Sequence, residues 1–312
     1  MRAMLLAAGL GTRLRPLTDL LPKPAVPLLG RPLAHYAIDC LLAAGVTELA
    51  ANAHHLPDHV EAVVRERVPS AIVSRESVLL GTGGGIRAAL LALADQTRPI
   101  DPDEPFLVSN ADVLFGADFG AALAIHRARG AFATMILRRD PRAETLGPIG
   151  VDASSRVRQI LRTPAWGEPL ETMMFTGLSI LSGAAVLDLP ANGSSIQGGF
   201  QRWLARGLPV EGVVEQAPFR DLGTPAEYLA AHRDLLSGAV RWPGVAPAAA
   251  WIDTSARVSP AARLEFVSVG ARAEVADGVF LRRAVVWPDT VVRQSDEDVI
   301  LFPSGRLVAS GS

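Results

Sequence analysis

The chain has 312 residues, of which 49% are apolar and 20% charged, and its formal net charge is −2. A core of useful size is therefore available, and the mixed charges give no basic surface of the kind that binds nucleic acid. Apolar stretches end well before the roughly 18 residues of a membrane span, and Met1 leads directly into a strand-like run. We expect a cytoplasmic protein with no signal peptide and no membrane or nucleic-acid partner.

Short apolar runs alternate with amphipathic stretches from residue 1 to 236, which is typical of β-α units around a sheet. The predicted strands are 3–8, 48–53, 71–74, 106–110, 132–138, 156–161 and 174–181. The predicted helices are 32–44, 58–68, 84–94, 119–129, 197–205 and 225–236. We therefore predict an α/β domain over 1–236 with a Rossmann-like mixed, mostly parallel sheet.

Residues 237–249 are rich in Gly, Pro and Ala and read as a linker, after which the pattern changes. Aliphatic residues then recur six apart, with two slips of phase: Ile252, Val258, Leu264, Val269, Val275, Leu281, Val286 and Val292. This spacing predicts a short left-handed parallel β-helix over 250–312, with an antiparallel β-domain as the alternative. Stacked repeats offer flat flanks, so we expect a homo-oligomer formed through this domain.

Cysteine and histidine chemistry is not indicated. Cys40 is the only cysteine, and the apolar run around it suggests a packed helix position. His54, His55 and His59 lie close together, but Pro57 interrupts any helix that would align them, and no acid or thiol has zinc spacing.

A glycine-rich turn follows the first strand, and such turns expose N–H groups to phosphate. Its sequence fits neither a P-loop, which needs Gly-Lys-Ser/Thr, nor a dinucleotide fingerprint, which needs glycine in place of Leu14. Arg13 and Arg15 leave the turn and suit a triphosphate tail. Of the 30 basic residues only Lys23 is a lysine, which suggests that its position requires a compact ammonium.

The run G-L-G-T-R-L-R-P-L-T at 9–18, followed by P-K-P around Lys23, resembles the sugar-1-phosphate nucleotidyltransferases. It is most similar to mannose-1-phosphate guanylyltransferase-like members with a C-terminal hexapeptide β-helix. The resemblance implies transfer of a nucleotidyl group from a nucleoside triphosphate to a sugar 1-phosphate, with release of pyrophosphate. It also implies that Arg13 contacts the outer phosphates and that Lys23 contacts the reacting phosphates.

The same resemblance implies a nucleotide site in the glycine turn and in the later segment around Gly81-Thr82-Gly83, whose small residues would admit a nucleobase. The expected nucleotide-binding residues are Leu6, Ala8, Gly9, Gly11, Thr12, Arg13, Glu76, Gly81, Thr82 and Gly83.

Asp112 and Asp221 each follow a strand-like apolar run, where α/β sheets place ligands. Taken alone, each is more often a helix or turn cap, but together they resemble the two magnesium ligands of the family. Mg²⁺ binds through one or two carboxylates plus phosphates and water. We therefore expect a Mg²⁺ site at Asp112 and Asp221, with Arg13, Lys23 and Asp112 as the catalytic residues.

For the sugar phosphate, the resemblance implies contacts from Lys23, Gly150, Arg162, Thr176 and Gly177. Many relatives carry Glu-Lys-Pro where this chain has Leu161-Arg162-Thr163-Pro164. The acid that would hold sugar hydroxyls is thus missing at Leu161, and the sugar is left open.

The L-G-T-G-G sequence at 80–84 favours GTP with mannose 1-phosphate or a related hexose or heptose phosphate. A UTP- or dTTP-dependent transferase and an inactive regulatory subunit remain alternatives. A hexapeptide acyltransferase is excluded because no histidine follows His232, and a nicotinamide dehydrogenase is disfavoured by Leu14.

Overall fold

The computed structural model describes residues 1–164 and 171–308 of the chain. Two compact units can be distinguished, and they do not follow chain order. The first consists of Met1–Leu10, Ala34–Ala111 and Phe115–Ala217, and the second of Gly11–Leu33, Asp112–Leu114 and Pro218–Ser312. The second unit thus combines the predicted β-helix region with three segments of the predicted catalytic domain, 11–33, 112–114 and 218–236.

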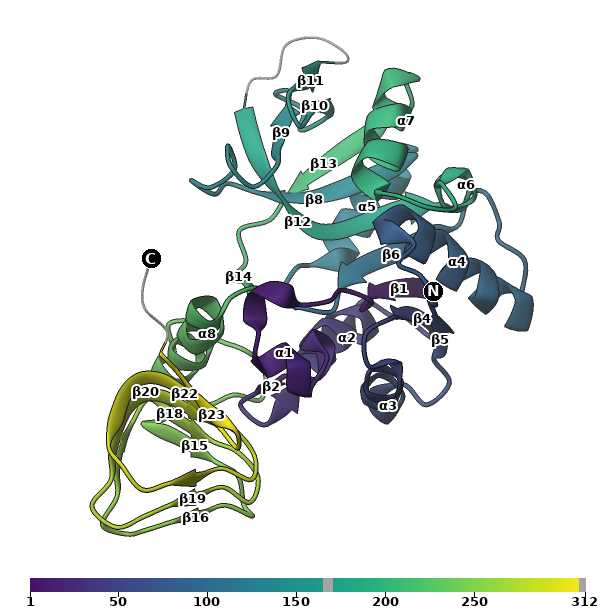
Figure 1. Ribbon diagram of the computed structural model, residues 1–312. Coiled ribbons are helices and arrows are strands. Elements are labelled where there is room, and N and C mark those ends of the chain that lie inside the picture. The colour runs from purple at the N-terminus through teal and green to yellow at the C-terminus, as the bar shows by residue number, and fades with distance from the viewer. Residues whose placement is uncertain (165–170, 309–312) are drawn as a thin grey trace. The chain divides into compact units, whose positions relative to one another are not determined.

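The first unit is built on a sheet whose N-terminal part is parallel, as predicted (Figure 1). Strand β1 lies between β4 and β6, and β5 pairs with β4. These strands are nearly continuous apolar runs because helices cover them, and Met4 and Ala50 are fully buried. Their bounds are β1 Arg2–Leu6, β4 Glu48–Ala53, β5 Ile72–Arg75 and β6 Pro105–Asn110.

The remainder of this sheet is organised by the long strand β12, which makes the sheet mixed. It pairs antiparallel with β6, β8 and β9, and β10 and β11 extend the β9 side as a hairpin, whereas β13 pairs parallel with β8. The bounds are β8 Ala133–Arg138, β9 Pro148–Val151, β10 Val157–Ile160, β11 Thr163–Pro164, β12 Glu171–Ser182 and β13 Val210–Val214.

Helices of the first unit bury apolar faces against the sheet. Helix α4 packs on β1, β4 and β5 and contributes Ile86 and Leu90 to the core. The α-helix predicted for 197–205 is wrong in its first part, because residues Ile196–Gln201 form a π-helix in which Gly198 and Gly199 lie against Pro190 and Leu189. The α-helix bounds are α2 Leu33–Ala43, α3 Pro57–Arg67, α4 Gly81–Gln96, α5 Phe119–Ala128, α6 Gly183–Asp188 and α7 Arg202–Ala205.

The second unit begins with a chain of short turns and hairpins. Two 3₁₀ turns and the two-stranded pairs β2–β3 and β7–β14 precede helix α8. The bounds are η1 Thr12–Leu14, α1 Leu17–Leu20, η2 Lys23–Ala25, β2 Pro27–Leu28, β3 Arg31–Pro32, β7 Val113–Phe115, β14 Phe219–Asp221 and α8 Pro225–Ser237.

The C-terminal region is β-rich, and most of its parallel strand pairs share one offset in sequence. Ile252 lies opposite Val269, which lies opposite Val286 in parallel register, so partners are 17 residues apart. Val258, Val275 and Val292 form a second such series. An offset of 17 is one residue fewer than three six-residue repeats, which matches the slips of phase in the sequence, whereas β20 and β22 pair with a shorter offset, with Ala284 opposite Val299. The bounds are β15 Ala250–Ile252, β16 Arg257–Val258, β17 Arg263–Glu265, β18 Val267–Val269, β19 Glu274–Val275, β20 Phe280–Val286, β21 Val291–Val292, β22 Asp296–Phe302 and β23 Gly305–Val308.

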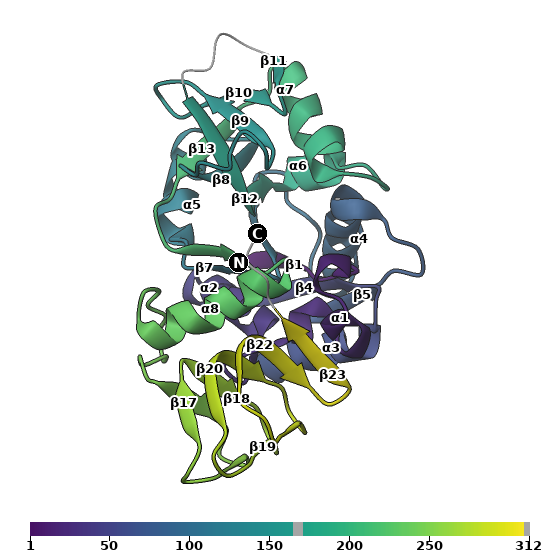
Figure 2. The ribbon, with the colours of Figure 1, turned by 60° about the vertical axis from the view of Figure 1, so that its left-hand side comes forward.

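Helix α8 joins this region to the rest of the second unit. Aliphatic side chains of the C-terminal strands, among them Val269, Leu281 and Val299, form a core. On the outside, α8 packs against β18, β20 and β22 (Figures 1 and 2). Within the described ranges, no helix has both the length and the apolar character needed to cross a membrane.

Candidate active site

The glycine turn of the second unit folds back on itself and supports Lys23. Gly11 has a left-handed backbone (φ 62°), and its carbonyl accepts hydrogen bonds from the Leu14 amide and the Thr18 hydroxyl at 2.9 Å. A Cβ at Gly11 would lie 2.8 Å from Thr18 Cγ2 and 3.3 Å from Lys23 Cβ. Glycine is therefore required here by both conformation and space.

Lys23 lies at the start of the turn Lys23–Ala25, after the extended residue Pro22. The residue is only 6% exposed. Its Nζ donates a hydrogen bond to Asp112 Oδ2 at 2.7 Å and lies 3.8 Å from Asp221 Oδ1. The ammonium thus compensates two carboxylates at once, which is what permits a lysine to be buried at this position.

The two aspartates come from segments that are distant in sequence but adjacent in the second unit. Asp112 precedes β7, Asp221 ends β14, and these two strands pair with each other. Their side chains are 35% and 32% exposed, so solvent and a ligand can reach the carboxylates. Convergence of two carboxylates on one cationic group fits the oxygen donors that a hard divalent ion requires.

If Asp112 and Asp221 were the only protein ligands, most coordination positions of such an ion would be filled by phosphate oxygens and water. In residues 1–164 and 171–308 there is no group of three or more His, Cys, Asp and Glu side chains that could hold a metal.

Arg13 lies at the rim of the same group of charges. Its side chain is 65% exposed, and Nη2 is 3.7 Å from Asp221 Oδ2. The guanidinium packs on Gly223, where a Cβ would lie 2.7 Å from Nη2. Sequence reasoning missed Gly223 as a site residue, although the run Asp221-Leu222-Gly223-Thr224 after a strand was a usable signal.

In the first unit, a buried asparagine organises the predicted nucleotide segments. Asn52 Oδ1 accepts the Ala7 amide at 2.8 Å, and its Nδ2 donates to Glu76 Oε1 at 2.7 Å. Glu76 Oε2 in turn accepts the Leu80 amide at 2.9 Å. Glu76 therefore links Asn52 to the loop before α4, with one carboxylate oxygen on each. Asn52 was also missed, and its only signal was an amide inside an apolar strand.

The glycine run at the start of α4 allows a close approach to the segment 190–195. A Cβ at Gly81 would lie 2.6 Å from the Gly193 carbonyl oxygen, and the Gly83 amide donates to that oxygen at 2.8 Å. Thr82 Oγ1 lies 3.0 Å from Ser195 Oγ and accepts the Ser195 amide at 2.8 Å. These contacts explain structurally why glycine occupies these positions, independently of the predicted nucleobase contact.

The predicted sugar-phosphate residues of the first unit have different environments. Gly177 has φ 85°, and a Cβ there would lie 2.4 Å from Asn110 Nδ2, so glycine is obligatory. The neighbouring Thr176 is 2% exposed, and its hydroxyl donates to the Ile136 carbonyl at 2.7 Å. Gly150 is buried within β9. The Thr176 hydroxyl is thus engaged within the sheet.

Leu161 and Arg162 form the turn of the β10–β11 hairpin, both with positive φ (52° and 62°). Arg162 is 72% exposed, and its Nη2 lies 3.1 Å from Glu144 Oε2. An acidic side chain, Glu144, therefore lies beside Arg162. It comes from a different loop than the acid of the Glu-Lys-Pro pattern of the family.

The remaining predicted residues provide backbone or apolar surface. Ala8 is buried and Leu6 is half-buried, whereas Gly9 and Thr12 are exposed. A Cβ at Gly9 would have no neighbouring atom within 4 Å, so the surroundings of this glycine are open. Burial raises the pKa of the Cys40 thiol to about 11, with a smaller contribution from Asp39, which fits the predicted packing role.

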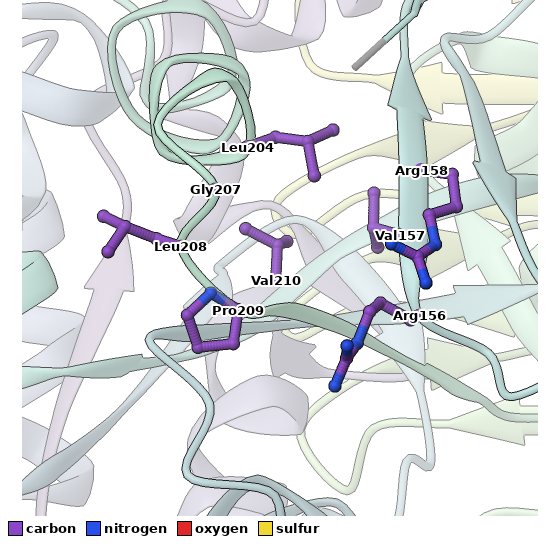
Figure 3. A pocket seen from close by; sticks show the side chains of 8 residues that line it. All are labelled: Arg156, Val157, Arg158, Leu204, Gly207, Leu208, Pro209 and Val210. Atoms are coloured by element: carbon purple, nitrogen blue, oxygen red, sulfur yellow. The ribbon is translucent and has the colours of Figure 1, made fainter. Parts of the chain in front are cut away.

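A separate cavity of about 260 Å³ lies between the β10 strand and the segment 204–210 (Figure 3). None of the predicted site residues lines it. Its two arginines are already paired, Arg156 with Glu211 at 2.9 Å and Arg158 with Asp152 at 2.7 Å. The cavity is therefore not the candidate site.

Comparison with known proteins identifies the family. Residues 2–238 match the family described as "Nucleotidyl transferase". A mannose-1-phosphate guanylyltransferase of Mycobacterium tuberculosis is 31% identical, covering 91% of this chain and 79% of the relative. A UTP–glucose-1-phosphate uridylyltransferase of Synechocystis is 27% identical, covering 99% and 86%. The chain belongs to the nucleotidyl transferase family and is a sugar-1-phosphate nucleotidyltransferase.

A solved structure shares this fold. The crystal structure of HddC from Yersinia pseudotuberculosis complexed with GMP-PN has a TM-score of 0.58 at 23% identity, and the match covers 74% of this chain and 97% of that chain.

Proposed function

We propose that the protein transfers a guanylyl group from GTP to mannose 1-phosphate or a related hexose or heptose phosphate. The observation that carries the proposed site is the contact of Lys23 Nζ with Asp112, 2.7 Å away, with Asp221 at 3.8 Å. The choice of GTP is supported by the L-G-T-G-G sequence and by the guanylyltransferase relative at 31% identity. The uridylyltransferase relative supports the alternative of UTP or dTTP.

In the proposed reaction, an oxygen of the sugar phosphate attacks the α-phosphorus of the nucleotide and pyrophosphate leaves. The second pKa of a phosphate monoester is about 6, so the nucleophile is already ionised near neutral pH and needs no general base. The task of the protein is therefore to align two anions and to neutralise their charge.

Lys23 is suited to this alignment. An ammonium has three N–H donors, and only Asp112 lies within hydrogen-bond distance among the two aspartates. The other donors can bind phosphate oxygens. Arg13, exposed and packed on Gly223, would hold the departing pyrophosphate through its forked guanidinium.

Asp112 and Asp221 would hold Mg²⁺. When bound, the ion supplies positive charge that lowers the repulsion between the phosphates. In the first unit, we propose that the main chain of Leu6, Ala8 and Gly9 and the segment 81–83 bind the nucleotide. Gly150, Arg162, Thr176 and Gly177 would line the sugar-phosphate pocket, the last two chiefly through shape and main chain.

We further propose that residues 250–312 form a left-handed parallel β-helix after a linker at 237–249, that this domain mediates homo-oligomer formation, and that the protein is cytoplasmic. The 17-residue offset that recurs in most of the parallel strand pairs supports the β-helix, since it corresponds to about three short repeats.

A pyrophosphate-release assay tests the proposal. GTP, UTP, dTTP, ATP and CTP are each combined with the 1-phosphates of mannose, glucose and heptose in the presence of Mg²⁺, with Asp112→Asn as the inactive control. We expect the highest kcat/KM for GTP with one of the mannose-like acceptors. Preference for UTP or dTTP would favour the alternative, and no turnover in any combination would indicate an inactive regulatory subunit.

A further inference from the structure

Strand β14 carries Arg220 next to the proposed metal ligand Asp221. The strand has only three residues, Phe219, Arg220 and Asp221, and side chains alternate between the two faces of a strand. Arg220 and Asp221 therefore point to opposite faces. Whatever holds Arg220 also holds the backbone from which the Asp221 carboxylate projects.

The partner of Arg220 is Asp234, in the last turn of α8. Arg220 Nη2 pairs with Asp234 Oδ2, and Arg233 Nη2 lies 3.1 Å from Asp234 Oδ1. The Asp234 side chain is only 6% exposed. Arg220 Nε is also buried and has no partner among the described residues, so the Nη2 contact is the main anchor of this guanidinium.

Helix α8 is itself firmly fixed. Its start is closed by a capping box between Thr224 and Glu227, three residues after Asp221. Farther along, the buried Tyr228 hydroxyl donates to the Pro27 carbonyl, four residues after Lys23. The Asp234 carbonyl accepts the Val240 amide at 2.9 Å. The helix thus contacts both segments that bear the proposed reactive charges.

The C-terminal strands add to this support. Helix α8 packs against β18, β20 and β22, and the ring of Trp251 lies against Gly30, where a Cβ would be 2.1 Å from the indole. The region after α8 is therefore part of the frame around Asp221.

We propose that Asp234 is a positioning residue for the metal site: through Arg220 it fixes β14 and so directs the Asp221 carboxylate toward Lys23. The inference rests on the proposed role of Asp221 as a metal ligand. It assigns to α8 a part in catalysis.

The test compares Asp234→Asn and Arg220→Lys with the parent protein, using the full chain. Mn²⁺ alone is titrated by electron paramagnetic resonance, and kcat and KM are measured by pyrophosphate release. We expect the Mn²⁺ dissociation constant to rise about tenfold and kcat to fall about tenfold in Asp234→Asn, with KM for the nucleotide within about twofold. Arg220→Lys keeps the charge but loses the fork, so its effects should be smaller.

Asp298→Asn is the matched control. It removes a carboxylate that interacts with the same helix but does not contact β14 in the described structure. We expect its melting temperature to fall while Mn²⁺ binding and kcat stay within about twofold of the parent. A purely structural role for Asp234 would give the same pattern in Asp234→Asn, and that result would overturn the proposal.

If Asp234→Asn does not fold, the double variant Asp234→Asn/Arg220→Gln removes the buried Asp234 carboxylate together with its partner, the partly exposed Arg220 guanidinium, and so leaves neither charge without the other. It should fold and still bind Mn²⁺ weakly, and binding equal to the parent would overturn the inference. Asp221→Asn separates the two levels of the argument. Unchanged Mn²⁺ binding in that variant would refute both, whereas its loss together with normal binding in Asp234→Asn would refute only the positioning role.

Discussion

The two compact units use their polar residues in opposite ways. In the first unit, Glu76, Thr82 and Thr176 are bonded to the protein itself, and glycines such as Gly81 and Gly177 allow close backbone approach. In the second unit, charges converge and remain accessible. Arg13 is 65% exposed, and Asp112 and Asp221 are about one-third exposed.

This difference indicates a division of labour. Side chains that already have protein partners can offer a ligand shape and main-chain groups, but little uncompensated charge. Charges that only compensate one another can exchange partners when phosphates and a cation arrive. Substitutions in the second unit should therefore affect turnover most, and substitutions in the first unit should affect stability and substrate affinity.

The largest effect is expected for Asp112→Asn and Asp221→Asn. Each keeps the side-chain size but removes a negative charge beside Lys23, and we expect kcat to fall at least about a hundredfold with little change in the melting temperature. Steady-state pyrophosphate release and thermal melting measure both. Asp95→Asn, on the exposed face of α4, should behave like the parent. Activity near normal in either test variant would contradict its ligand role.

The next largest loss of activity is expected for Lys23→Arg, although this substitution preserves the charge. Lys23 is 6% exposed and its Nζ lies 2.7 Å from Asp112, so a longer, planar guanidinium does not fit between the carboxylates. A displacement of about 1 Å can cost on the order of a hundredfold in rate, and we expect the loss mainly in kcat.

Arg65→Lys, at an exposed position of α3, is the control for arginine–lysine exchange. A kcat within about threefold of the parent would show that Lys23 is not required.

In the first unit, Gly85→Ala should reduce stability rather than chemistry. The new Cβ would lie 2.5 Å from Asn52 Nδ2 and 2.9 Å from Glu76 Oε1, which would separate the two side chains that hold the loop before α4. We expect a loss of about 1–3 kcal/mol in unfolding free energy and a raised KM for the nucleotide, with kcat spared. Chemical denaturation and kinetics measure these changes.

Gly120→Ala is the control, because this glycine is exposed in α5 and its Cβ would meet only a side-chain oxygen of Asp118. If kcat fell as far in Gly85→Ala as in the Asp112 and Asp221 variants, the proposed difference between the two units would be contradicted.

The sequence allowed the parallel strands and their helices to be predicted closely, because each is a continuous apolar run or an amphipathic stretch. The strand predicted at 48–53 is β4, and the helix predicted at 119–129 differs from α5 by one residue. The glycine turn and Lys23 could also be recognised from the sequence as candidate site residues. These features are local, and local patterns can be read without knowing the fold.

Features that depend on long-range contacts could not be predicted. Asn52 joins Ala7 to Glu76, Gly223 makes room for Arg13, and Asp234 meets Arg220 across 14 residues. The π-helix at Ile196–Gln201 depends on the contact of Gly198 with Pro190. In each case the residue type is ordinary for its local sequence, and only the partner gives it a role.

The smallest expected effect concerns His126, a buried histidine of the first unit that takes no part in the proposed chemistry. It is 4% exposed, its Nδ1 lies 2.9 Å from Thr134 Oγ1, and burial, aided by Arg127, lowers its pKa to about 4. In the unfolded chain the pKa is about 6.5, so between pH 6.5 and 4 the unfolded state takes up a proton that the folded state refuses. Stability from this group is complete above pH 6.5 and is lost progressively as the pH falls toward 4. The double variant His126→Leu/Thr134→Val removes the titrating group and its partner together, so its melting temperature should fall less steeply than that of the parent between pH 6.5 and 4.5.

The control is His59→Gln, at an exposed position of α3, whose melting temperature should depend on pH as steeply as that of the parent. An unchanged slope in the double variant would mean that the acid sensitivity arises elsewhere, for instance at the fully buried His232 of the second unit, whose pKa burial lowers to about 3.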